Sequence, residues 1–478
     1  MQHTVEKIGG TSMSNYEAVR DNVVLGPGYA DNPYNRIFVV SAYGGMTDLL
    51  LSHKKTGEPG VYALFANADE RSDWLVGLDR VSARIREINE GLFSDDVLLQ
   101  RSMSFITTRL KDAERCLADL QSVCRHGHFA LGSYLNTVKE MLASLGEAHS
   151  AWNMTHLLRE EGIDARFVDL TGWNSAKQHS LDEAIRNAFA GIDLRRELPI
   201  VTGYAHCEAG LMRTFHRGYS EMTFSRIAVL TGAREAVIHK EYHLSSADPR
   251  LVGVDQVVPI GRTNYDVADQ LANLGMEAIH PQAAKGLRAS NIPLRVKNCF
   301  EPEHDGTLVT PDYVSENPCV EIIAGRRNIY ALECLDPDMS GMLADYDRSI
   351  IDEIRRFKAP IVSKDVNANT VTHFLATNLK TVQRIRAAVA EHYPEAQLQV
   401  RKVAIVSAIG SDLNVAGLLA KSVDALARAG VGILAMHQSM RQVDMQFVID
   451  EEQYEHAVRA LHQRLVEAHD HGDAICAA

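Results

Sequence analysis

The segment "RIFVVSAYGGMTDLL" (residues 36–50) decides the fold class, because it combines an apolar strand, a glycine turn and the start of a helix. Its run of Ile, Phe and Val is typical of a strand buried on both faces of a sheet. Similar runs occur at 165–170, 198–203, 235–240 and 292–298, with helical periodicity between them, as over 146–162. This alternation predicts an α/β fold, in which helices cover a mainly parallel sheet.

The pattern changes after residue 312. The stretch 306–318 contains two prolines and is typical of a linker. Beyond it, the order strand, helix, strand, strand, helix occurs twice, which predicts two small α+β domains in tandem. We therefore expect a large domain at 1–312 followed by small domains at 319–398 and 399–470. Residues 55–135 look helical and are expected to form an insertion or a lid.

Composition limits the function classes. The chain has 478 residues, 46% of them hydrophobic, and a net charge of −13, which argues against nucleic acid as the main partner. There is no signal-peptide pattern and no apolar run of membrane-spanning length. The seven cysteines include no CxxC pair. We expect a reduced, cytoplasmic protein that binds no membrane.

The turns after the expected strands are candidate binding loops, since ligands of open α/β sheets bind beyond the carboxyl ends of the strands. In "KIGGTS" (7–12), paired glycines let backbone N–H groups approach an oxyanion, and the lysine adds a positive charge. Taken alone, this motif is equally compatible with an ordinary surface turn. The second glycine pair follows residues 36–40. The alternative interpretation of this pair is a plain turn before a helix.

Two further loops and one acid are weaker candidates. Arg217 and Ser220 precede an expected helix, where the arginine is able to hold a carboxylate or simply lie on the surface. A charged loop at 239–252 closes with Asp248-Pro249-Arg250, which is also a common turn. Glu147 is expected in the first turn of its helix, where the helix dipole alone favours an acid.

Other enzyme classes lack their motifs. The chain has no GxxxxGK[ST], no protein-kinase motif set and no HExxH. His126, His128 and the "HDHGD" stretch at 469–473 have no accompanying acid or thiol cluster, so solvated histidines are the simpler interpretation. We expect no direct metal ligand.

Taken in order, these motifs resemble those of the aspartate kinases, which have the amino acid kinase fold followed by tandem ACT domains. The family pattern K-F-G-G-T-S resembles residues 7–12, and V-V-S-A-x-G-G-x-T-D/N-x-L resembles 39–49. G-E-x-x-S-A is matched at 146–151, G-R-G-G-S-D is similar to 216–221, and T-A-D-P-R is close to 246–250. Within the family, the chain most resembles the branch associated with ectoine biosynthesis.

The resemblance implies ATP-dependent phosphorylation of the L-aspartate side chain to 4-phospho-L-aspartate, with Mg²⁺ bridging the ATP phosphates. Lys7 and Glu221 would be catalytic. The other implied roles are phosphate binding by Gly9, Gly10, Ser12, Ser41, Gly44 and Gly45, aspartate binding by Thr47, Glu147, Arg217 and Ser220, and nucleotide binding by Lys240, Glu241, Pro249 and Arg250.

The resemblance also implies regulation and assembly. Effector binding, with lysine or threonine as the usual ligands, is expected at Asp338, Met339, Ser340, Gly341 and Met342. The ACT domains of the family pair through their sheets, so a homodimer or higher homo-oligomer is expected. The strand "VEIIA" (320–324) is expected to belong to the second ACT domain.

The chain departs from the family pattern at four places. Tyr219 replaces a glycine, Glu221 replaces an aspartate, Lys240-Glu241 stands for Thr-Asp, and Glu277 replaces a lysine. Two other functions therefore stay open from the residues: a non-catalytic amino-acid sensor, and a kinase with another carboxylate acceptor such as glutamate.

Overall fold

The computed structural model describes residues 2–54, 56–68, 70–126, 128–175, 177–215, 218–276, 279–469 and 471–475. The chain forms two compact units. The first unit comprises Met1–His243 and Ile279–Pro311, and the second comprises Leu244–Ala278 and Asp312–Ala478.

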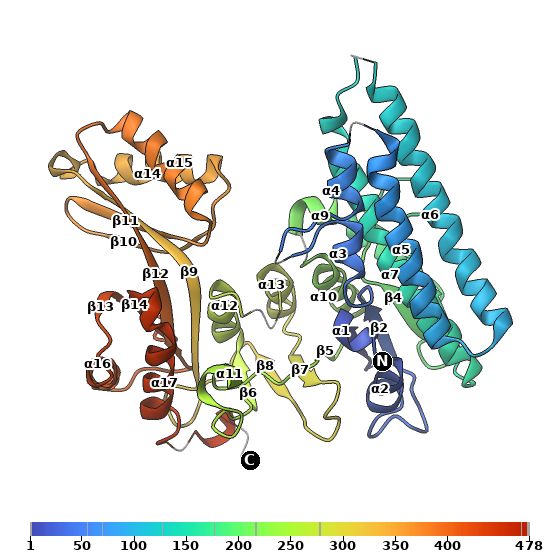
Figure 1. Cartoon of the computed structure of the whole chain (residues 1–478). Coiled ribbons are helices and arrows are strands. Elements are labelled where there is room, and N and C mark those ends of the chain that lie inside the picture. Colours follow the sequence, from blue (N-terminus) through green and yellow to red (C-terminus); the bar gives the residue numbers. More distant parts are fainter. Residues whose placement is uncertain are drawn as a thin grey trace. The chain divides into compact units, whose positions relative to one another are not determined.

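A mainly parallel sheet forms the centre of the first unit, as the alternating pattern predicted (Figure 1). All its described pairings are parallel except that of the last two strands, β7 with β8. The strands β1, β2 and β4 are buried along their whole length, which explains the apolar runs of β2 and β4, while β1 also buries Glu6 and Lys7. Within this unit their order is β3 (Ala165–Val168), β4 (Leu198–Thr202), β2 (Arg36–Val40), β1 (Thr4–Ile8), β5 (Glu235–Lys240), β7 (Leu294–Asn298) and β8 (Thr307–Thr310).

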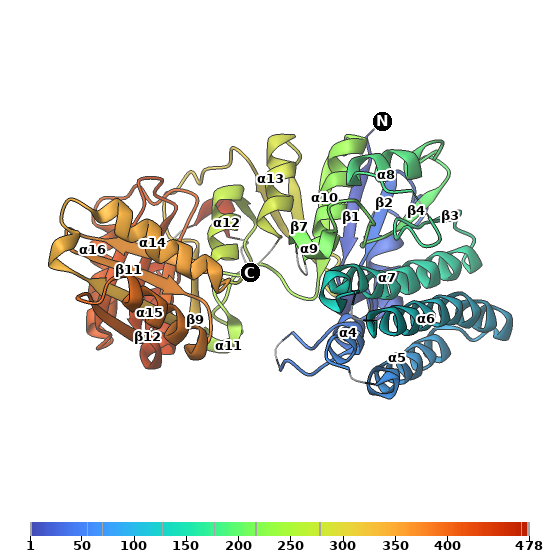
Figure 2. The same ribbon diagram turned by 90° about the horizontal axis from the view of Figure 1, so that it is seen from above.

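Helices lie on both faces of this sheet (Figure 2). One face packs on α7 through residues that include Ala151, Met154 and Leu158. The helix α10 contacts β1, β2 and β5. The helices of the unit are α1 (Gly10–Met13), α2 (Tyr16–Ala18), α3 (Met46–Leu50), α4 (Val61–Ala66), α5 (Arg71–Leu92), α6 (Asp96–Cys124), α7 (Leu135–Glu160), α8 (Leu181–Phe189), α9 (Leu211–Phe215), α10 (Tyr219–Thr231) and α13 (Pro281–Ala289), with a π-helix over Val19–Val24.

The region 55–135 is helical as expected. The long helices α5 and α6 lie side by side, and α6 packs on α7 (Figure 2). The expectation for the next helix is wrong in one respect, because α7 begins at Leu135 and not near residue 146. Glu147 therefore lies in the middle of a helix, and the helix dipole does not account for it.

The second unit contains one antiparallel sheet that serves both α+β repeats. Its strand order is β10 (Ile361–Val366), β11 (Thr370–Leu375), β9 (Ile322–Leu335), β12 (Gln397–Ile409), β14 (Asp444–Asp450) and β13 (Ile433–Gln438). Its other elements are α11 (Pro249–Val252), β6 (Arg262–Asn264), α12 (Tyr265–Asn273), α14 (Leu343–Arg356), α15 (Leu379–His392), α16 (Leu418–Arg428) and α17 (Tyr454–Leu465).

The two long strands β9 and β12 each contribute one half to each repeat. The carboxyl half of β9 packs with α14 and α15 of the first repeat. Residues 322–324 pair with 407–409, and Ile323 packs in a cluster with residues of α16 and α17. The expectation that "VEIIA" belongs to the second repeat is thus confirmed.

In the described parts of the chain, no helix is both long and apolar enough to cross a bilayer.

Candidate active site

The two predicted glycine turns, at 7–12 and 41–45, and the start of α10 meet around a cavity of about 400 Å³. The cavity lies beyond the carboxyl ends of β1 and β2, where an open α/β sheet places its ligand. Its lining is Lys7, Gly10, Thr11, Ser41, Ala42, Tyr43, Gly44, Gly45, Thr47, Asp48, Lys54, Glu147, Tyr219, Ser220 and Glu221. Residues as far apart in the sequence as Lys7 and Glu221 therefore line the same cavity, as the sequence pattern indicated.

Lys7 is held in place by the strand that carries it and by one carboxylate. It lies on β1, and its residue is 7% exposed. Its Nζ is 3.6 Å from Oε1 of Glu221. Glu221 lies in the first turn of α10, where a negative charge is favoured, and its Oε2 accepts a hydrogen bond from the backbone N–H of His280. This places a lysine ammonium at the cavity wall.

The two glycine turns pack directly on each other. A Cβ at Gly10 would lie 2.6 Å from the carbonyl oxygen of Ala42, a distance that real side chains do not reach. The Ser14 hydroxyl accepts a hydrogen bond of 2.9 Å from the Gly44 N–H. Gly45 has φ of +79°, a left-handed conformation that favours glycine. The close approach explains why this sequence has glycine at these positions.

Two residues expected to bind phosphate do not line the cavity. The N–H of Gly9 donates to the His239 carbonyl at 3.2 Å and so belongs to the pairing of β1 with β5. Ser12 has no exposed surface. The cradle that the structure builds is thus made from Gly10 and the 41–45 turn.

Glu147 is buried in the cavity wall with unused hydrogen-bonding capacity. It is 2% exposed, and its Oε2 has no hydrogen-bond partner among the described residues. Burial raises its pKa to about 8, although Lys7, the Tyr219 side chain and backbone N–H groups act in the opposite direction. A buried acid without a full set of partners is a candidate for binding a cationic group.

Gly203 is a residue that sequence reasoning missed. A Cβ there would lie 2.7 Å from Cβ of Ser220 and 3.1 Å from Oε2 of Glu147. The absence of a side chain lets α7 and α10 bring these two groups to the same cavity. The only sign of this role in the sequence is that a glycine ends the expected strand 198–203. Asp48, Lys54, Thr11 and Tyr219 also line the cavity and were not among the expected site residues.

The remaining expected residues lie elsewhere. Lys240 ends β5 and Glu241 follows it, and neither lines the cavity. The Lys240 Nζ lies 5.9 Å from the ring centre of Tyr242. Arg217, together with Glu277, lies outside the described residues. Pro249 and Arg250 belong to the second unit, where the Arg250 guanidinium bonds to Asp248 at 2.7 Å.

The expected effector segment Asp338, Met339, Ser340, Gly341 and Met342 also lies in the second unit. It begins in a short 3-10 turn capped by Asp336, whose side chain accepts the N–H of Asp338 at 2.9 Å. Met339 is fully buried, whereas Met342 is 53% exposed.

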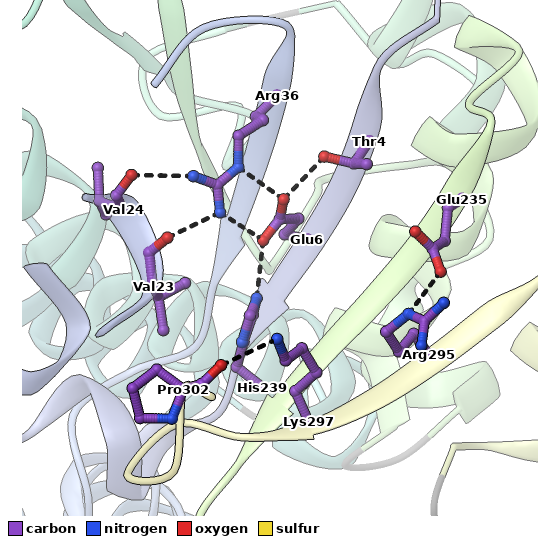
Figure 3. A network of polar contacts seen from close by, with 10 residues as sticks. All are labelled: Thr4, Glu6, Val23, Val24, Arg36, Glu235, His239, Arg295, Lys297 and Pro302. Carbon is purple, nitrogen blue, oxygen red and sulfur yellow. Dashed lines mark hydrogen bonds and ion pairs between the residues drawn. The ribbon is translucent and has the colours of Figure 1, made fainter. Parts of the chain in front are cut away.

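A buried ionic network supports β1 on the opposite face from Lys7 (Figure 3). Arg36 donates two hydrogen bonds to Glu6, at 2.7 and 2.8 Å, and His239 Nε2 lies 2.7 Å from the same carboxylate. Burial by itself raises the pKa of Glu6, but Arg36 and His239 hold it well below its usual range. The network joins β1, β2 and β5 beneath the Lys7 side of the sheet, and no sequence motif marked it.

Comparisons with known proteins agree with this architecture. The model of the amino acid kinase family matches residues 2–298, and that of an ACT domain matches residues 406–465. Aspartate kinase Ask_Ect of Stutzerimonas stutzeri is 55% identical, and the match covers 100% of both chains. The chain belongs to the aspartate kinase family. Its resemblance to the ectoine-associated branch is confirmed by this relative.

More distant aspartate kinases extend the comparison. Aspartokinase 1 of Arabidopsis thaliana is 23% identical over 98% of this chain and 80% of its own. Escherichia coli aspartokinase III, in a complex with aspartate and ADP, superposes with a TM-score of 0.71 at 21% identity, covering 97% of this chain and 100% of that chain. At this identity the superposition shows that this aspartate kinase shares the fold.

Proposed function

We propose that the chain transfers the γ-phosphoryl group of ATP to the side-chain carboxylate of L-aspartate, giving 4-phospho-L-aspartate and ADP. The observation that carries this proposal is a single cavity that combines the Lys7 ammonium, two interlocked glycine turns and the buried Glu147 carboxyl. The first two suit a phosphoryl group, and the third suits the ammonium group of an amino acid.

In the proposed step, a carboxylate oxygen of aspartate bonds to the γ-phosphorus while the bond to the β,γ-bridging oxygen breaks. Such a transfer depends on positioning and charge stabilisation rather than on covalent help from the protein. Lys7 stabilises the charge of the moving phosphoryl group, and Glu221, 3.6 Å away, holds the ammonium in place. Gly10, Ser41, Gly44 and Gly45 bind phosphate oxygens, with Gly9 and Ser12 shaping the turn from behind.

At the aspartate end, Glu147 binds the substrate ammonium. Its raised pKa means that the free enzyme holds it protonated near neutral pH, so the proton leaves when the ammonium binds. Thr47 and Ser220 complete the pocket with hydroxyl groups, and Arg217 grips the α-carboxylate through a two-pronged contact. Together these four residues would select an amino acid as the acceptor.

At the nucleotide end, the proposal assigns Lys240, Glu241, Pro249 and Arg250 to ATP. Among the described residues, no group of three or more His, Cys, Asp or Glu side chains is arranged to hold a metal ion. Mg²⁺, which prefers hard oxygen ligands, fits here as an ion held mainly by the ATP phosphates, where it neutralises their charge.

The second unit supplies regulation and assembly in this proposal. Asp338–Met342 would bind an amino-acid effector, lysine or threonine, and the ACT sheets would join chains into a homodimer or a higher oligomer. The boundaries 1–312, 319–398 and 399–470 and the cytoplasmic location stay predictions.

The test is ATP turnover with L-aspartate, L-glutamate or neither, with acyl phosphate trapped as hydroxamate. We expect hydroxamate with aspartate only. Lys7→Ala should lower kcat about 100- to 1,000-fold, as loss of one charge-stabilising group does in comparable sites, with little change in the KM for aspartate. Lys111→Ala, an exposed lysine on α6, is the matched control. ADP formation without hydroxamate, or a Lys7 variant changed only in KM, would contradict the proposal.

A further inference from the structure

We propose that a second cavity of the first unit, next to the candidate active site, binds an acidic α-amino acid such as glutamate or aspartate. Its volume is about 250 Å³. It lies between α5 and the loop at 53–60, and it shares Gly44, Gly45 and Asp48 with the active-site cavity. None of the residues that distinguish it belongs to the phosphoryl-transfer site.

One wall of this second cavity carries positive charge. Arg80 and Arg84 line it from α5, one helical turn apart and therefore on the same face. The Arg80 guanidinium has no hydrogen bond or ion pair to any residue that the structure describes. Arg84 pairs with Glu87, whose side chain is 69% exposed, and such surface pairs contribute little. Two guanidinium groups are thus available to carboxylates, which they recognise through paired hydrogen bonds.

The loop side of the cavity contributes carboxylates together with His53, whose Nε2 lies 3.8 Å from Oδ2 of Asp48. Glu58 lines the cavity from the loop, and in the described parts of the chain its carboxylate has no partner. The other carboxylate of this side, Asp48, accepts the N–H of Lys54 at 3.2 Å and is therefore partly occupied. The guanidinium groups of α5 and the carboxylate of the loop match a ligand with two carboxylates and one ammonium group. Acidic amino acids have this distribution of charge.

The described residues on either side of Glu58 are held by backbone contacts. Ser52 and Pro59 form an antiparallel bridge, and the N–H of His53 donates to the Glu58 carbonyl at 2.8 Å. A Cβ at Gly60 would lie 2.4 Å from the carbonyl oxygen of Leu49, so the loop turns back against α3 at that point. The charged walls are therefore held on defined elements, and a ligand does not have to order them first.

Size separates this ligand from nucleotides. The cavity is smaller than the roughly 300–1,000 Å³ of sites for drug-sized ligands. Its apolar side chains, Leu49 and Pro59, suit the methylene groups of a small ligand side chain. Because the ligand would touch the Gly44–Gly45 turn, its binding should be felt in the neighbouring active site.

The test is equilibrium dialysis of the full-length chain against radiolabelled L-glutamate, without ATP. We expect Arg80→Ala/Arg84→Ala to lose one bound glutamate per chain, or to weaken its binding at least tenfold. Arg86→Ala, an exposed arginine of the same helix outside the cavity, should bind as the unaltered chain does. Glu58→Gln should weaken glutamate but leave glutarate, which lacks the ammonium group, unchanged.

Identical isotherms for the double variant and the unaltered chain would overturn the proposal, as would equal losses of glutamate and glutarate in Glu58→Gln. Unfolding curves of each variant establish that the protein is folded. Kinase activity with L-aspartate, measured on the same preparations, is a separate readout. A chain that phosphorylates aspartate but shows no arginine-dependent glutamate binding refutes this inference alone.

Discussion

Replacing Glu147 with glutamine should make the free protein more stable while it weakens aspartate binding. Glutamine keeps the shape of the side chain and removes its titration. In the folded chain, burial raises the pKa of Glu147 from 4.5 to about 8. Folding above pH 4.5 therefore takes up a proton, so the stability of the unaltered chain falls as pH rises between these two values.

The size of the effect follows from the same two pKa values. At pH 7 the folded chain carries a proton on a group that is ionised in the unfolded chain. The proton uptake lowers the free energy of unfolding by about 1.4 kcal/mol for each pH unit above 4.5. The loss is about 3 kcal/mol at pH 7 and less than about 1 kcal/mol at pH 5. Glutamine has no such cost. We expect Glu147→Gln to gain about 3 kcal/mol of unfolding free energy at pH 7 and little at pH 5.

The assay is urea unfolding at both pH values, combined with the KM for aspartate. Glu140→Gln is the control, since Glu140 lies on the same helix but its oxygens accept hydrogen bonds from Tyr204 and from the Arg213 N–H. That variant should gain nothing. A Glu147→Gln chain that is less stable, or equally stabilised at pH 5 and pH 7, would refute the reasoning.

Two further outcomes are expected, one from the buried network behind β1 and one from the glycine turns. Arg36→Met leaves the Glu6 carboxylate buried without its main partner, which should lower the free energy of unfolding in urea by about 3–5 kcal/mol. Adding Glu6→Gln should recover part of the lost stability. An Arg36→Met chain with an unchanged urea midpoint would contradict a stabilising role of this network. Gly10→Ala places a Cβ 2.6 Å from the Ala42 carbonyl and should separate the glycine turns, lowering kcat/KM. Gly91→Ala on α5 is the control, because a Cβ there meets nothing within 4 Å. It should leave activity unchanged and stabilise the fold by about 0.5–1 kcal/mol. Equal kinetics for the two alanine variants would contradict the importance of the packed turns.

The candidate site was predictable where chemistry and sheet geometry coincide. Lys7 lies near the end of β1, Gly10 follows that strand, and Gly44 and Gly45 follow β2. Neighbouring parallel strands end at the same edge of a sheet. An apolar run identified β2, whereas β1 (TVEKI) has none and was marked only by the glycine motif that follows it. The tandem repeat after residue 312 was also predictable, because both repeats have the same order of strands and helices.

The position of Glu147 was not predictable in this way. Gly146 was interpreted as the start of a helix, but it lies inside α7, where a Cβ would come within 2.8 Å of Ala42 Cβ. The true start has no capping side chain at Tyr134, so the usual signal is missing. A glycine required for close packing thus resembled a helix boundary, and the burial of Glu147 became visible only with the tertiary structure.

The helical region before α7 is better explained as a scaffold than as a lid. Asn89 of α5 accepts a 2.9 Å hydrogen bond from Asn153 of α7, and its Oδ1 lies 2.7 Å from His149 Nε2. Ser102 of α6 donates to Asn153 at 2.7 Å, and all four side chains are fully buried.

Lifting α5 and α6 from α7 would leave these groups unpaired inside the protein, at roughly 1–3 kcal/mol for each. Burial also lowers the pKa of His149 to about 3, so protonation does not loosen the cluster near neutral pH. Since α7 carries Glu147 and α5 carries Arg80 and Arg84, one helical layer holds both proposed amino-acid sites in a fixed relation. A ligand in the second cavity therefore has to act through the shared Gly44–Gly45 turn rather than by moving these helices.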